Sequence, residues 1–130
     1  MRLRVVDGAY AVCRLAGDRP LVAPPPGAAF WSLTQAGAER SLVCREADAP
    51  DPAAEGEGDA VVIGGWRVLQ VEGPLDLGLT GVMAALAGTL AGAGVPIFPI
   101  ATHDTDWILV PGEQLEAALA ALRAAGHETV

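Results

Sequence analysis

The second half of the chain has a regular pattern of hydrophobic positions that predicts alternating strands and helices. Apolar and β-branched runs predict strands over residues 61–73, 95–102 and 106–110. Apolar residues spaced three or four apart predict amphipathic helices over about 77–93 and 113–125, each ended by glycine. A short strand at the end of the chain completes the order βαββαβ, which is the ferredoxin-like arrangement of an α+β fold.

The first half of the chain shows strands of the same kind but no regular helix. Residues 3–15 predict one bent strand or two short strands, and the runs 30–34 and 40–46 predict a hairpin whose loop contains glycine. Three consecutive prolines within residues 18–29 exclude a regular helix there, except at the ends of the segment. We therefore expect the first half to be a degenerate copy of the second, with antiparallel sheets in both.

The boundary between the halves lies in residues 46–59, where apolar content almost vanishes. These fourteen residues contain six acidic residues, two prolines and two glycines, which is typical of a solvated linker or a mobile loop. We place a degenerate N-terminal half at 1–60 and a complete C-terminal half at 61–130.

The composition of the chain limits the classes of partner and compartment. Its 130 residues carry sixteen acidic residues, eight arginines and no lysine, and the net charge of -8 argues against a nucleic-acid partner. Cys13 and Cys44 lie in apolar, strand-like runs without metal-ligand spacing, so we expect reduced core thiols. The N-terminus lacks the apolar stretch of a signal peptide, and we expect a cytoplasmic protein.

An uncharged run covers residues 77–102 and must be weighed as a membrane span. Two prolines interrupt the run and its large apolar residues fall on one helical stripe, so we predict an amphipathic helix and no span. The other face of this helix is small, with Gly81, Ala85, Gly88 and Gly92. Such a face either covers a sheet or packs against a second copy, and we expect a homodimer.

The turn between a predicted strand and its helix, residues 73–82, is the first candidate ligand site. Free N–H groups and the macrodipole at a helix start favour an anion such as the carboxylate of an amino acid. Gly73 and Gly81 leave room for that ligand. The alternative is that Asp76 simply caps the helix and satisfies these N–H groups.

A tight turn near the end of the next predicted strand brings two carboxylates together and is the second candidate. Asp104, or the carbonyl groups around Ile100 and Ala101, can hold an ammonium group, while Thr102 offers a hydroxyl. Asp106 begins the following strand beside the same crevice. The alternative is an Asx-type turn in which the Asp104 side chain bonds its own backbone.

Neither catalysis nor metal binding is expected. The chain has no GxSxG, P-loop or GxGxxG motif. Cys44 and His103 can act as nucleophile and base only if folding brings them together, and a buried structural thiol is the commoner role for Cys44. His127 is the only other histidine, and no acidic residue stands at metal-ligand spacing from it. We expect no metal and no cofactor.

Two sequence blocks resemble the ACT-domain family. They are LTGV at 79–82 and ATHDTDWILVP at 101–111, and the surrounding stretch 65–128 resembles the family as well. The earlier run FWSLTQAGAERSLVCRE at 30–46 is similar to the N-terminal hairpin of these proteins. The resemblance is to small bacterial proteins related to the ACT repeats of animal cytosolic arginine sensors, and it covers nearly the whole chain.

The resemblance implies two tandem ACT-like halves and a regulatory or sensory module that binds a small molecule, usually an amino acid, without catalysis. The ligand is expected in a crevice at a domain or subunit interface. The alternative function is an adaptor that pairs with a partner protein through its ACT-like surfaces and binds no metabolite. The expected ligand-binding residues are Gly73, Leu79, Thr80, Gly81, Val82, Ile100, Ala101, Thr102, Asp104 and Asp106.

Overall fold

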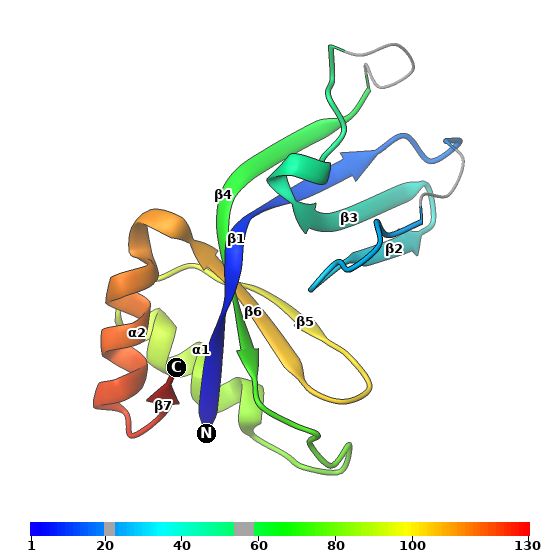
Figure 1. Ribbon diagram of the computed structural model, residues 1–130. Helices are drawn as coiled ribbons and strands as arrows, with labels where there is room; N and C mark the ends of the chain where they lie inside the picture. The colour runs from blue at the N-terminus through cyan, green and yellow to red at the C-terminus, as the bar shows by residue number, and fades with distance from the viewer. Residues whose placement is uncertain (20–22, 54–58) are drawn as a thin grey trace. The chain divides into compact units, whose positions relative to one another are not determined.

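The computed structural model describes residues 1–19, 23–53 and 59–130 (Figure 1). In this part of the chain, seven strands run in the order β2-β3-β1-β4-β6-β5, and β7 pairs with β1. The elements are β1 Arg2–Leu15, β2 Ser32–Ala36, β3 Glu39–Arg45, η1 Glu46–Asp48, β4 Val61–Val71, α1 Val82–Gly92, β5 Phe98–Ala101, β6 Asp106–Pro111, η2 Gly112–Gln114, α2 Leu115–Ala124 and β7 Glu128–Thr129, where η marks a 3-10 helix.

The chain divides into two compact units. The helical unit consists of residues 1–7 and 66–130, and the strand unit consists of residues 8–65. This division differs from the predicted boundary in the acidic segment, because β1 and β4 each contribute residues to both units. It falls at Gly8 and Gly65, whose φ angles of 96° and 80° are conformations that favour glycine. That the strand unit is a degenerate copy of the other stays a prediction.

The helical unit has the predicted order βαββαβ, from β4 through α1, β5, β6 and α2 to β7. Both helices cover one face of its sheet (Figure 1), and their apolar stripes meet the inward side chains of β4 and β6. This arrangement confirms the α+β, ferredoxin-like prediction, and burial at roughly 25 cal/mol per Å² of apolar surface holds helices to sheet. The fully buried core residues include Leu3, Leu69, Leu86, Leu90, Ile108, Val110, Ala118 and Leu122.

The first strand of the chain enters the sheet of the helical unit between β4 and β7. The Glu72 amide donates to the Arg2 carbonyl at 2.8 Å, while Arg2 and Leu3 pair with Glu128 and Thr129. β4, β5 and β6 pair antiparallel, as predicted, whereas the short β1–β7 pair at this edge is parallel. The sequence pattern does not reveal this pairing because the partners lie at opposite ends of the chain.

Helix α1 begins later than predicted, at Val82 instead of about residue 77. Gly81 precedes the helix with a φ of 82°, which is not a helical conformation, so the apolar periodicity before it continues into a turn. Asp76 is not the N-cap, and no side chain of the described residues caps α1. Neither α1 nor any other helix in the described part of the chain has the length and apolar character needed to cross a membrane.

In the strand unit, β2 and β3 form the predicted hairpin and β3 pairs with β1, antiparallel in both cases. Only Gly37 and Ala38 separate the two hairpin strands, and Gly37 has a φ of 58°. β4 is continuous through Gly64 and Gly65. One face of this unit buries a second apolar core that contains Ala11, Cys13, Leu15, Leu42, Cys44 and Ala60.

The two irregular connections of the strand unit are described in part. Residues 20–22 of the proline-rich segment and 54–58 of the acidic segment lie outside the described residues, so the expected mobile loop stays a prediction there. Glu46–Asp48 forms a 3-10 helix at the start of the acidic segment. The Gly65 amide donates to Glu46 Oε1 at 2.5 Å, which anchors this start to β4.

Cys13 and Cys44 lie in the core of the strand unit, as predicted. Both are free thiols, 2% and 0% exposed, on the neighbouring strands β1 and β3. The hydrogen bond between the two side chains lowers the pKa of Cys13 and raises that of Cys44, and burial adds to the rise at Cys44. Their packing, more than their acidity, decides whether a reagent reaches them.

We expect Cys13 and Cys44 to react with a thiol reagent only when the strand unit unfolds, because a thiolate must be exposed to attack. Labelling with a chromogenic disulfide should be slow in native buffer and should reach two thiols per chain in urea. The single variants Cys13→Ala and Cys44→Ala show which thiol is responsible for each phase of the labelling reaction. Rapid labelling of the native protein would show that β1 and β3 open readily and would reopen a catalytic role for a cysteine.

Candidate functional site

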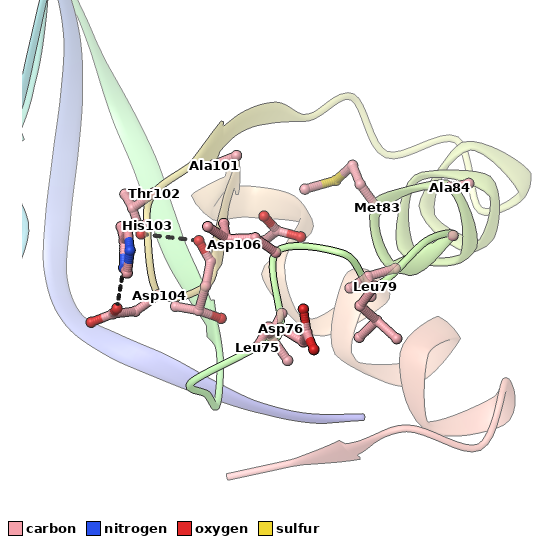
Figure 2. A pocket seen from close by; sticks show the side chains of 14 residues that line it. Leu75, Asp76, Leu79, Met83, Ala84, Ala101, Thr102, His103, Asp104 and Asp106 are labelled. Carbon is pink, nitrogen blue, oxygen red and sulfur yellow. Dashed lines mark hydrogen bonds and ion pairs between the residues drawn. The ribbon is translucent and has the colours of Figure 1, made fainter.

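A pocket of about 300 Å³ lies in the helical unit, where the loop before α1 faces the turn between β5 and β6 (Figure 2). Its lining residues come from two stretches, within 75–84 and 101–106. Small-molecule sites in proteins span roughly 300–1,000 Å³, so this pocket is large enough for a small metabolite. Both stretches carry the candidate residues that the sequence singles out.

Two features hold the loop against the turn. The Leu75 amide donates to the Asp104 carbonyl at 2.7 Å. Gly73 approaches the same turn so closely that a Cβ atom there would lie 3.0 Å from the Asp104 oxygen and 3.2 Å from the Thr105 Cβ. A side chain at position 73 would therefore push the two sides of the pocket apart.

Asp76 fixes the shape of the loop that precedes α1. Its Oδ1 accepts a hydrogen bond from the Gly78 amide at 2.8 Å, and its carbonyl accepts one from the Leu79 amide at 3.0 Å. Leu77 and Leu79 remain 73% and 52% exposed on this loop. The Asp76 carboxylate bonds within the loop and does not cap the helix. No other described side chain caps the first-turn amides of α1, which begin at Val82.

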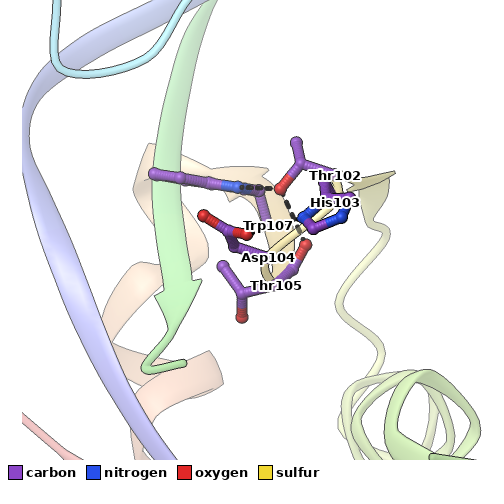
Figure 3. Close-up of polar contacts among 5 residues, drawn as sticks. All are labelled: Thr102, His103, Asp104, Thr105 and Trp107. Atoms are coloured by element: carbon purple, nitrogen blue, oxygen red, sulfur yellow. Dashed lines mark hydrogen bonds and ion pairs between the residues drawn. The ribbon is translucent and has the colours of Figure 1, made fainter. Parts of the chain in front are cut away.

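Two threonines close the turn on the other side of the pocket (Figure 3). The Thr102 amide and hydroxyl both donate to the Thr105 carbonyl, at 2.9 and 3.0 Å, and Trp107 Nε1 donates to the Thr102 hydroxyl at 3.2 Å. Thr105 is 5% exposed, and its hydroxyl donates to the Val71 carbonyl at 2.5 Å. The Thr105 bond attaches the turn to the end of β4, while the other bonds close the turn itself.

The two carboxylates of this turn point in different directions (Figure 2). Asp104 Oδ1 lies 2.8 Å from His103 Nδ1, and both side chains are largely exposed. The half-buried Asp106 begins β6 and turns toward the start of α1. The predicted Asx turn at Asp104 is wrong, because Thr102 already closes the turn and the Asp104 carboxylate bonds His103 instead.

The pocket is lined both by acidic side chains and by the first residues of α1. Of the described residues that line it, Asp76, Asp104 and Asp106 carry carboxylates, His103 carries the imidazole, and none is arginine or lysine. The carboxylates favour a cationic group, while the start of α1 favours an anionic one. Within the described residues, no group of three or more His, Cys, Asp and Glu side chains is placed to hold a metal ion.

Most of the predicted ligand-binding residues come together around this pocket. Those that line it are Leu79, Gly81, Val82, Ala101, Thr102, Asp104 and Asp106. Gly73, Thr80 and Ile100 do not line it: Gly73 acts by close approach, and Ile100 lies on the opposite face of β5 from Ala101 because side chains alternate along a strand. That these residues bind a ligand stays a prediction.

Sequence analysis missed several lining residues. Met83 and Ala84 reach the pocket because α1 begins at Val82, whereas a helix that starts near residue 77 would place them in its second turn. Gly81, followed by an apolar run, is the signal that a later start is available, since glycine readily adopts a positive φ. The others not in the predicted set are Leu75, Asp76, Leu77, His103 and Thr105.

The fold of the whole chain is similar to that of several solved proteins. An Agrobacterium tumefaciens protein shares 29% identity at a TM-score of 0.85, over 99% of this chain and 91% of that one. A Vibrio cholerae protein described as a possible transport protein shares 21% identity at a TM-score of 0.66, over 92% and 85%. No curated protein sequence matches the chain.

Regulatory proteins of amino-acid metabolism show the same fold at lower identity. The regulatory subunit of aspartate kinase from Thermus thermophilus shares 18% identity at a TM-score of 0.56, over 92% of this chain and 93% of that one. Residues 61–124 also match the family model of the ACT domain, and this range holds nearly all of the βαββαβ unit that surrounds the pocket. The chain therefore carries an ACT domain over residues 61–124.

Proposed function

We propose that the chain is a regulatory module that binds an amino acid in the pocket of the helical unit and catalyses no reaction. The observation that carries this proposal is that the pocket is lined both by the start of α1, whose first-turn amides no described side chain caps, and by the Asp106 carboxylate. These two features match the carboxylate and ammonium groups of an amino acid. The shared fold with regulatory subunits of aspartate kinase supports a regulatory role.

The charges of the pocket favour a ligand that is zwitterionic or carries a net positive charge. Three carboxylates line it, and none of its described lining residues is arginine or lysine. A second carboxylate on the ligand would therefore meet repulsion instead of a cationic partner. Leu79 and Met83 supply apolar contact for an aliphatic side chain.

The side chains around the pocket support a function without catalysis. The hydroxyl groups of Thr102 and Thr105 both donate to backbone carbonyls, and His103 bonds Asp104. Cys44 lies in the core of the strand unit and is 0% exposed. A nucleophile paired with a base, which covalent catalysis requires, is therefore absent from the described lining residues. The two free thiols also agree with a cytoplasmic location.

A homodimer through α1 would give the module its regulatory mechanism. The helix buries Leu86 and Leu90 against the sheet, and no described atom lies within 4 Å of a Cβ placed at Gly88 or Gly92. A face of small residues lets a second copy approach closely, and two-fold dimers are the commonest closed assemblies. Ala84 lies four residues before Gly88, on the same side of α1, and also lines the pocket, so a ligand there can favour one assembly state over another.

The variant Gly88→Arg should remove the dimer without unfolding the chain. Gly88 is exposed and helical, so arginine there should stabilise α1 by about 0.5–1 kcal/mol while blocking a second copy. Sedimentation should show a lower mass, and urea unfolding an unchanged or raised stability. Ala117→Arg, on the exposed side of α2, is the matched control and should leave the mass unchanged. A Gly88→Arg protein with the native mass would exclude this face as the interface.

A thermal-shift screen with the twenty amino acids tests the function itself. A ligand at one hundred times its Kd adds about 2.7 kcal/mol of stability, which is readily measured. We expect stabilisation by neutral or basic amino acids and none by aspartate or glutamate. If no amino acid stabilises the protein, the proposal fails, and an adaptor that pairs with a partner protein through the small face of α1 becomes the better explanation.

A further inference from the structure

We propose that the strand unit carries a second ligand site, which binds a small amphipathic ammonium ion. The site is a cavity of about 270 Å³ whose described lining residues all belong to the strand unit. Its floor is apolar, one wall is the indole of Trp31, and charged side chains stand at its rim. None of its lining residues is shared with the amino-acid pocket, so the proposal goes beyond the function above.

Among the described residues, no α-helix covers the apolar face of the strand unit on which the cavity lies. In the helical unit, α1 and α2 pack their side chains onto the core. In the described part of the strand unit, the three-residue helix η1 and irregular chain cover the comparable core. The resulting space far exceeds the roughly 30 Å³ that one water molecule occupies, so it has the size of a small-molecule site.

The inner surface of the cavity is suited to a hydrocarbon group. Leu15 and Leu42 form its floor and are each 2% exposed within the core. Trp31 and Ala49 pack against the same core from the side. A hydrocarbon chain or a phenyl ring in this space would remove both its own surface and these walls from water. The indole of Trp31 additionally offers a π-face that attracts a cation.

One carboxylate at the rim is left to recognise a charged ligand. Arg19 and Asp51 also line the cavity, and each already has an interaction partner, although Nη1 of Arg19 is buried and makes no hydrogen bond of its own within the described part of the chain. Asp48 is exposed and has no hydrogen-bond or ion-pair partner among the described residues. Its negative charge reaches the core beneath the cavity, because it contributes to the raised pKa of Cys44 after the larger effects of the Cys13 hydrogen bond and burial.

These features together select the chemistry of the ligand. An ammonium group meets Asp48 and the face of Trp31, while its hydrocarbon part lies on Leu15 and Leu42. A carboxylate would be attracted by Arg19 but repelled by Asp48 and by Asp51, and these two carboxylates outnumber the one guanidinium among the described lining residues. A bare metal ion would find too few ligands, since the described residues contain no cluster of three metal-binding side chains.

Titration of the full-length protein with 2-phenylethylamine, followed by the indole NMR signals, tests the proposal. The isosteric 2-phenylethanol lacks the positive charge and shows whether binding depends on it. The negatively charged 3-phenylpropanoate shows whether the site distinguishes the sign of the charge. We expect a saturable shift of the Trp31 signal with the amine, at least tenfold weaker binding of the alcohol and no binding of the acid. The Trp31→Phe variant assigns the signal, and Trp107, which bonds Thr102 beside the other pocket, reports separately on binding there.

Variants of Asp48 and Ala49 test which residues bind the amine. Asp48→Asn should weaken binding of the amine about tenfold or more, because it removes the charge of the only unpartnered carboxylate among the described lining residues. Glu39→Gln, in the hairpin, is the control and should leave the affinity for the amine unchanged. Ala49→Leu should abolish the Trp31 shift by filling the cavity. Equal binding of amine and alcohol, preferred binding of the acid, full affinity in Asp48→Asn or no Trp31 response to the amine would each overturn the proposal.

Discussion

The variant Gly73→Val is expected to lose about 1–3 kcal/mol of stability, which is the range for forcing extra atoms into a packed site. The cause is steric: a Cβ atom at this position would lie 3.0 Å from the Asp104 carbonyl oxygen and 3.1 Å from the Leu75 nitrogen. Both atoms belong to the backbone, so they cannot move aside as a flexible side chain would. Urea unfolding of the variant and the native protein measures the loss.

The same substitution should also abolish amino-acid binding. Separating the loop from the turn breaks the 2.7 Å hydrogen bond from Leu75 to Asp104, and that bond joins the two sides of the pocket. Ala117→Gly provides the control, because glycine within the exposed side of α2 should lower stability by about 1 kcal/mol without touching the pocket. A Gly73→Val protein with native stability and ligand response would show that the loop and turn tolerate separation.

The order of elements in the helical unit was predictable because each element has a clear period of its own. The apolar, β-branched run of β4 and the three-to-four spacing of apolar residues in α2 are both direct signals of burial. The start of α1 was not predictable from periodicity, since Leu77 and Leu79 continue the apolar spacing but remain exposed on a loop. Backbone conformation at Gly81, not hydrophobicity, ends that pattern.

The pairing of β1 with β7 could not be predicted from the sequence, for a different reason. A period-two pattern tells which residues face the core, but it does not name the neighbouring strand. Leu3 is fully buried in the core of the helical unit although it lies in the first strand of the chain. The predicted division at residue 60 therefore separated this strand from the sheet that it completes.

The candidate site was predictable where turn chemistry is local and unpredictable where it depends on competition between side chains. The pairing of two turns followed from the βαββ order, which places the loop after β4 beside the turn after β5. The role of Asp104 did not follow, because Thr102 and Asp104 both have the chemistry to close a turn. Thr102 does so with its amide and its hydroxyl, which leaves Asp104 to bond His103.

Replacing Asp106 by asparagine is expected to weaken amino-acid binding by about 1.5–3 kcal/mol, the range for a hydrogen bond to a charged group. Asp106 is half-buried at the start of β6 and turns toward the start of α1 (Figure 2). Asparagine keeps the shape but removes the charge that attracts an ammonium group. Each 1.4 kcal/mol is a factor of ten in Kd, so a millimolar site would pass beyond detection by calorimetry.

Asp104→Asn is the matched control, because it makes the same chemical change two residues earlier, in a side chain that points in a different direction (Figure 2). The Asp104 side chain is 76% exposed and bonds His103, so water screens its charge and its loss should change the affinity much less. Calorimetry with the amino acid that the thermal screen identifies compares the two variants. If both bind as the native protein does, neither carboxylate contacts the ligand. If only Asp104→Asn loses binding, the ammonium group lies on the His103 side of the turn, and the assignment of the ammonium group to Asp106 is wrong.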